Sequence, residues 1–206
     1  MKKRKLINFD TPTLQDIQIA HQIFKAHESR DLFYRAATEL VALALNDKIS
    51  LSITEALAVL LQTWNRAFYQ YRKFDDQHFN EIECLINNHY STLIAFRCRS
   101  IESFNLECKT KVMQIFKRFE DVLGSVGAAK CLHLLAPHFF PLWDRAIATA
   151  YGFPLKMKGE NYEQYCKFME ILKEQSENLG REQVFVQNPL KAIDEYNYCR
   201  YTKHWI

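Results

Sequence analysis

Two charged side chains, Lys130 and Asp144, lie on either side of an aromatic turn in the stretch SVGAAKCLHLLAPHFFPLWDRAI. An amine and a carboxylate are groups that enzymes use for nucleophilic attack and for stabilising a cationic transition state. A structural interpretation is also open, in which Lys130 is a surface charge and Asp144 caps the helix that begins at Arg145. The spacing in the sequence allows either interpretation of the pair.

Two glycines, Gly124 and Gly127, precede the helix that carries Lys130. Glycine permits positive φ and allows backbone N–H groups to approach a ligand closely, which suits a phosphate at a helix N-terminus. Alternatively, Gly124 ends one helix and the two glycines form a tight turn between helices. Within the second helix the apolar residues repeat at helical spacing, so Lys130 and His133 are predicted to lie away from the buried face.

Other catalytic and metal-binding patterns do not occur in the sequence. It contains no G-x-S-x-G, phosphate-loop, dinucleotide-binding or H-E-x-x-H motif. The six cysteines are dispersed, and His133 and His138 have a poor spacing for metal ligands. We therefore expect no metal site and no cofactor.

The elements that position these residues are predicted to be helices. All five glycines follow residue 123, and only one of the five prolines precedes residue 137, so the first half of the chain has almost no helix breakers. The first helix is expected to be capped by Thr11 or Thr13, and the third to open on a capping box of Ser52 and Glu55. The expected helices cover residues 13–26, 29–46, 52–71, 76–88, 92–101, 106–123, 126–135, 145–151, 162–180 and 189–201.

The composition is that of one compact globular unit. The chain has 206 residues, of which 48% are hydrophobic, and this is enough for a sizeable core. A net charge of +3 is too small to indicate a broad cationic surface. No apolar run approaches the length of a membrane span, so we expect no membrane association. Dispersed cysteines are typical of a cytoplasmic protein with reduced thiols.

The two ends of the chain carry basic residues with two possible roles each. The KKRK segment at residues 2–5 is either a solvated tail or an arm that binds phosphate. The segment DEYNYCRYTKHWI, at residues 194–206, interleaves basic and aromatic side chains, a pattern that can bind single-stranded nucleic acid. The same pattern is also expected of an amphipathic terminal helix that docks its aromatic residues on the body of the protein.

Three segments in order resemble the helix-hairpin-helix DNA glycosylases, the superfamily typified by endonuclease III and 8-oxoguanine glycosylase. LGSVGAAKCL resembles the family's hairpin, and PLWDRAI resembles its catalytic aspartate motif, with Pro141, Asp144 and Ile147 matching that motif. Upstream, ITEALAVLLQTWNRAF resembles an early helix of the family and ends its apolar run at Gln62. The likeness covers residues 50–152, about half of the chain.

This resemblance implies an all-α fold of two lobes, one formed by residues 50–137 and the other by residues 1–49 and 138–206. The hairpin amides would hold a DNA phosphate, the target base would be extruded into a cleft, and Asp144 would support attack at the anomeric carbon. DNA is the partner that the resemblance implies. Its implied DNA contacts are Gly124, Ser125, Gly127, Lys130 and Arg66, and its implied base pocket contains Gln62, Trp64 and Trp143.

The hairpin departs from the family pattern in ways that bear on catalysis. Ser125 stands where the first hairpin glycine belongs, and Lys130 lies one residue beyond the position of the lysine nucleophile of bifunctional members. One residue rotates a helix position by about 100°, so Lys130 is only a weak candidate for that role. The resemblance thus implies a monofunctional or degenerate glycosylase that uses Asp144. The alternative is a non-catalytic helical module that binds DNA or a protein partner.

Overall fold

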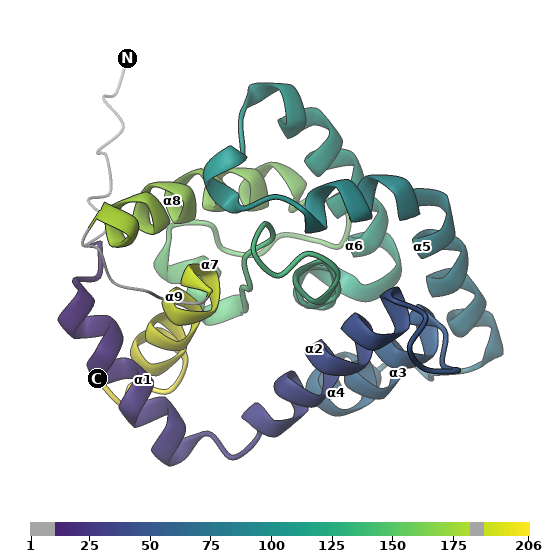
Figure 1. Ribbon diagram of the computed structural model, residues 1–206, viewed down its shortest axis with the longest axis horizontal. Coiled ribbons are helices and arrows are strands. Elements are labelled where there is room, and N and C mark those ends of the chain that lie inside the picture. Colours follow the sequence, from purple (N-terminus) through teal and green to yellow (C-terminus); the bar gives the residue numbers. More distant parts are fainter. Residues whose placement is uncertain (1–10, 182–187) are drawn as a thin grey trace.

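The computed structural model of the protein describes residues 11–181 and 188–206 (Figure 1). Every regular element in these residues is helical, which confirms the predicted all-α class. None of the helices in these ranges is long and apolar enough to cross a membrane. The basic segment at residues 2–5 lies outside the described residues. The helices are α1 (Leu14–His27), α2 (Asp31–Leu45), α3 (Ile53–Trp64), α4 (Arg66–Tyr69), α5 (Asp76–Arg97), η1 (Ile101–Ser103), α6 (Leu106–Leu135), α7 (Arg145–Ala150), α8 (Tyr162–Arg181), α9 (Pro189–Asn197) and η2 (Tyr198–Thr202).

Local sequence signals set the starts of the first and third helices. Thr13 forms a capping box with Asp16, in which the Thr13 hydroxyl accepts a hydrogen bond from the Asp16 amide and the Asp16 carboxylate accepts one from the Thr13 amide. Ser52 and Glu55 form the same box at the start of α3, as predicted. Hydrogen bonds to Thr13 and Ser52 lower the pKa of the Asp16 and Glu55 carboxyls respectively.

Two predicted helix boundaries were wrong. Residues 76–97 form the single helix α5, because this segment has no glycine or proline and buries Ile82, Ile86, Leu93 and Phe96 along one side. In contrast, the helix predicted over residues 52–71 is divided at Asn65, which separates α3 from α4. Neither change alters the helical class, but the break at Asn65 shapes a wall of the candidate site.

The helix α6 is kinked at Gly124, close to the predicted division between residues 123 and 126. Gly124 has φ of 71° and ψ of 166°, a left-handed φ that side chains other than glycine rarely adopt. A Cβ atom there would also lie 3.2 Å from the ring of Phe68. Glycine is therefore required at position 124 both for the left-handed backbone and for the small space beside Phe68. The helix restarts at Ser125.

The helices pack both on their sequence neighbours and on segments that are distant in sequence. The first helix, α1, packs on α9, and α6 packs on both α5 and α8 (Figure 1). The second helix, α2, packs mainly on α3, across the lobe boundary predicted between residues 49 and 50. The division into two lobes itself stays a prediction.

An aromatic cluster fills the centre of the fold behind the PLWD segment. The rings of Phe116 and Tyr165 stack with their centroids 4.0 Å apart, and Trp143 meets Tyr165 edge-on at 5.1 Å. The Nε1 atom of Trp143 donates a hydrogen bond to the carbonyl of Ser125 at 3.1 Å. This bond ties the segment before α7 to the start of the second part of α6, so the two motifs noted in the sequence are in direct contact.

The terminal aromatic residues dock on the body of the protein. Tyr196 is buried, Tyr198 contacts the ring of Phe24 on α1, and Trp205 contacts His27. The amphipathic interpretation of this segment is therefore confirmed for these side chains.

Candidate functional site

Asp144 is both a helix cap and a link between distant segments. Its Oδ1 atom accepts a hydrogen bond from the Ile147 amide at 2.8 Å, which confirms the predicted cap of α7. Its Oδ2 atom accepts a hydrogen bond from the Thr202 hydroxyl of η2 at 2.7 Å. The side chain is only half-buried. Asp144 is thus bonded beyond its own helix and is not sealed behind Trp143.

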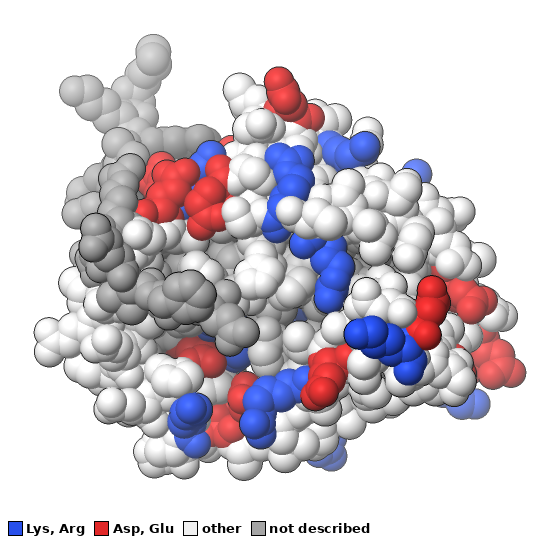
Figure 2. Space-filling model, in the orientation of Figure 1, with Lys and Arg blue, Asp and Glu red and all other residues white. Residues whose placement is uncertain are grey.

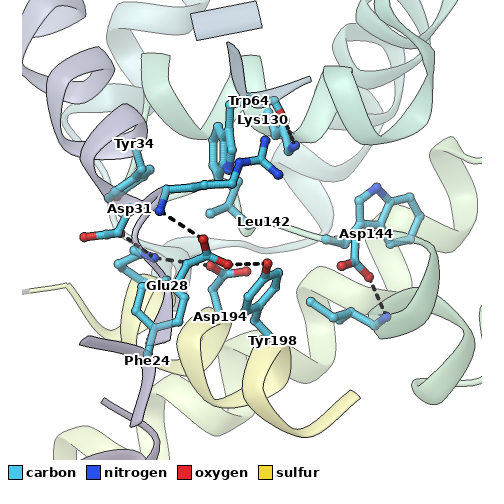
Figure 3. Close-up of a pocket in the computed structure, with 14 residues that line it drawn as sticks. Phe24, Glu28, Asp31, Tyr34, Trp64, Lys130, Leu142, Asp144, Asp194 and Tyr198 are labelled. Carbon is cyan, nitrogen blue, oxygen red and sulfur yellow. Dashed lines mark hydrogen bonds and ion pairs between the residues drawn. The ribbon is translucent and has the colours of Figure 1, made fainter. Parts of the chain in front are cut away.

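Two hollows meet at Asp144 and Lys130, which line both of them. We call the first the aromatic pocket, because Phe24, Tyr34 and Trp64 are among the residues that line it (Figure 3). We call the second the hairpin cleft, because its wall includes the segment from Gly124 to Gly127. The structure therefore brings the two sequence motifs and Trp64 to one place.

Lys130 is more enclosed than the sequence interpretation predicted. Its Nζ atom donates a hydrogen bond to the Trp64 carbonyl at 2.6 Å and lies 4.5 Å from the centroid of the Trp64 ring. Burial lowers the pKa of Lys130 to about 8, and the neighbouring Arg30 acts in the same direction, whereas Asp144 opposes the change. The prediction of an ordinary surface lysine was wrong, because the carbonyl and the ring of Trp64 hold its amine in the wall of the aromatic pocket.

The hairpin cleft contains a buried donor that the sequence interpretation missed. Asn65 is 5% exposed, and its Nδ2 atom has no hydrogen-bond partner among the described residues. An ideal Cβ atom at Gly127 would lie 2.7 Å from this nitrogen, so Asn65 points at the first turn of the restarted helix. A helix N-terminus and an unpaired amide donor both favour an anion. No sequence signal pointed to Asn65, because one uninterrupted helix was predicted over residues 52–71.

Close packing at Gly127 leads to a prediction for stability. Gly127→Ala is expected to lower the free energy of unfolding by about 1–3 kcal/mol, because the added methyl group would meet Asn65 Nδ2 at 2.7 Å and Leu123 Cβ at 3.1 Å. Gly180→Ala is the control, since no atom lies within 4 Å of its Cβ position, and a gain of about 0.4–1 kcal/mol is expected there. Urea unfolding of both variants checks this, and equal changes would contradict the assignment.

Three other predicted site residues lie in different surroundings. Gln62 is exposed and lines neither hollow, because α3 turns Leu57, Leu60 and Leu61 toward the core. Arg66 is also exposed and outside both linings, whereas Arg145, next to Asp144, lines the hairpin cleft. Trp143 lines the aromatic pocket, but it is 2% exposed and belongs mainly to the core.

A cluster of charges closes the aromatic pocket on the side of α9. The Nζ atom of Lys191 lies 3.6 Å from Asp31 Oδ1, 3.6 Å from Asp194 Oδ2 and 3.5 Å from Glu195 Oε1. Burial raises the pKa of Asp194 to about 6, although the nearby Lys191 opposes the change. Burial alone would lower the pKa of Lys191, but Asp194 and the other anions raise it above its ordinary value. Lys191 therefore stays charged as the shared counter-ion of three carboxylates.

Behind this cluster, His133 is a fully buried core residue. Its Nδ1 atom lies 2.7 Å from the Phe140 carbonyl, so Nδ1 carries the proton, and Nε2 accepts a hydrogen bond from the Tyr34 hydroxyl at 3.0 Å. Burial lowers its pKa to about 3, and the positive charge of Lys191 acts in the same direction. The predicted exposed position of His133 was wrong, because α2 covers this side of the helix.

Comparison of the chain with protein-family models gave no match, and neither did comparison with curated proteins or with solved structures. Within the described ranges, no cluster of three or more histidine, cysteine or acidic side chains could hold a metal ion. Figure 2 shows basic and acidic side chains interspersed on the face in view.

Proposed function

We propose that the protein is a DNA glycosylase-like enzyme that hydrolyses the N-glycosidic bond of a damaged nucleotide, with Asp144 assisting. One observation carries the proposal. The Asp144 carboxylate lies where an aromatic pocket meets a cleft walled by Gly124, Ser125 and Gly127. An extruded base requires an aromatic pocket, and its phosphate requires a nearby site with N–H donors.

In this proposal each hollow has a separate task. The hairpin cleft holds a backbone phosphate through the start of the restarted helix, the Asn65 amide and the positive charges of Lys130 and Arg145. The aromatic pocket receives the base. Asp144 stabilises the positive charge that develops on the sugar as the bond to the base breaks and water attacks the anomeric carbon. No cofactor is needed for this hydrolysis, and the cytoplasm is the compartment that we propose.

The test is base release from duplexes that each contain one oxidised, alkylated or deaminated base. Asp144→Asn is expected to reduce the rate of release about 100-fold. Asparagine caps a helix nearly as well as aspartate, so folding should be preserved. Asp75→Asn is the matched control, because Asp75 caps α5 through a bond to the His78 amide and lines neither hollow. Equal rates for wild type and Asp144→Asn would refute the catalytic role.

A second candidate function is binding without catalysis. It is favoured by the two hydrogen bonds of Asp144, because Ile147 and Thr202 together occupy both carboxylate oxygens. A carboxylate so engaged serves primarily to hold η2 against α7. Retention of duplex binding without release from any lesion would support this function, and fluorescence anisotropy at two salt concentrations measures that binding.

A further inference from the structure

The loop between α7 and α8, at residues 152–161, is held in place by a buried side chain. Asn161, at the end of this loop, is fully buried. Its Oδ1 atom accepts a hydrogen bond from the Lys156 amide at 2.7 Å, and its Nδ2 atom donates one to the Met157 carbonyl at 2.9 Å. The buried carboxyl group of Glu120 accepts hydrogen bonds from the backbone amide and the side chain of Asn161. Asn161 therefore fixes the middle of the loop on α6.

Two further contacts place this loop beside the hairpin cleft. Leu155 lines the cleft itself. Gly159, further along the loop, has φ of 86°, and an ideal Cβ atom there would lie 2.9 Å from Asp121 Oδ1. Asp121 belongs to the last turn of α6 before the kink at Gly124. The three residues between Leu155 and Gly159 therefore connect the cleft to the end of the first part of α6.

These three residues, Lys156, Met157 and Lys158, are exposed. Two acidic residues, Asp121 and Glu160, lie at the Gly159 end of the loop, so Lys156 is the charged residue next to the cleft. A loop whose backbone is already fixed loses little conformational entropy when its side chains bind a partner. Such a loop is suited to hold positive charge at a set position beside the cleft.

We propose that this segment, which we call the lysine loop, binds the backbone of DNA next to the hairpin cleft, with Lys156 and Lys158 each contacting a phosphate. Lysine contacts of this kind add affinity and fix the position of the duplex, but they do not read its sequence. The exposed Arg145 of the cleft continues the same basic surface. The inference rests on the proposed function for the choice of DNA as the partner.

The test measures binding of an undamaged duplex by fluorescence anisotropy and requires no catalysis. Lys156→Gln and Lys158→Gln are combined in one variant. Loss of two phosphate contacts is expected to weaken binding about tenfold at low salt and to reduce the slope of log affinity against log salt by about 1.8. The control combines Lys48→Gln with Lys111→Gln, which remove the same charge from two exposed lysines outside both hollows. Its slope should equal that of the wild type.

The outcomes for this inference and for the catalytic proposal are separate. Equal losses in the two double variants, an unchanged slope in the lysine-loop variant, or no duplex binding by the wild type would overturn the inference, even if damaged bases are released. If no lesion is released but the slope falls only in the lysine-loop variant, the catalytic proposal fails and the lysine loop stands as a DNA contact. Circular dichroism checks that both double variants are folded, as expected for changes at exposed lysines.

Discussion

Trp143→Ala is expected to lower the free energy of unfolding by about 3–5 kcal/mol, the loss typical of a buried tryptophan. Trp143 is 2% exposed and packs against Phe116, Tyr165 and Phe168 in the centre of the fold. Truncation would leave a cavity at the junction of α6, α7 and α8. It would also leave the Ser125 carbonyl without the hydrogen bond from Trp143 Nε1. Both losses occur where the PLWD segment contacts the segment from Gly124 to Gly127.

Trp205→Ala is the matched control for this measurement. Trp205 is half-buried and contacts His27 and Tyr198 at the edge of the fold, so its truncation should cost clearly less. Denaturant unfolding followed by circular dichroism gives both free energies. If Trp143→Ala lost no more unfolding free energy than Trp205→Ala, Trp143 would not be a central core residue. Such a result would favour its predicted role in the base pocket.

His133→Gln is expected to destabilise the protein by about 2–5 kcal/mol at pH 7, because two buried hydrogen bonds are disturbed. The cost should depend on pH. The pKa of His133 is lowered to about 3 in the folded protein, whereas an unfolded histidine has a pKa near 6.5. Below pH 6.5 the unfolded state therefore binds a proton that the folded state does not. The stability that neutral His133 contributes is present above this pH and is lost as the pH falls.

The measurement is the difference in unfolding free energy between wild type and His133→Gln at pH 7 and at pH 5. Linkage predicts that this difference shrinks by about 2 kcal/mol over that interval. Taking the difference between the two proteins cancels the pH dependence of stability that other groups contribute. One such group is Asp194, whose raised pKa favours the folded state as the pH falls. His138→Gln is the control, because His138 is exposed. A difference that is the same at both pH values would show that His133 is not held neutral in the folded state.

Local features of the fold were predictable from the sequence because their causes are local. The capping boxes at Thr13 and Ser52 depend on residues three positions apart, and the cap at Asp144 depends on the turn before it. The kink at Gly124 depends on a backbone conformation that glycine allows. The uninterrupted α5 was missed because its polar middle resembles a turn, although the packing of its apolar face maintains the helix.

The site was predictable only in part, because contacts between distant segments form it. Asp144 and Lys130 were recognised from their positions around the turn, and Trp64 was a base-pocket candidate through the family resemblance. Spacing along the chain gave no indication that Lys191 would lie 3.6 Å from Asp31. For the same reason His133 was expected on an exposed face. Its hydrogen-bond partner Tyr34 is ninety-nine positions away in the sequence.

The packing of α1 on α9 has a consequence for protein synthesis. Asp194 and Tyr198, which complete the aromatic pocket, and Thr202, which holds Asp144, all follow α1 and α6 in the sequence. During synthesis α1 and α6 are made before these residues, so the pocket can close only after α9 has been made. Prematurely terminated chains would therefore carry Lys130 and Asp144 without a finished pocket, and the uncovered apolar side of α1 would mark them for proteolysis.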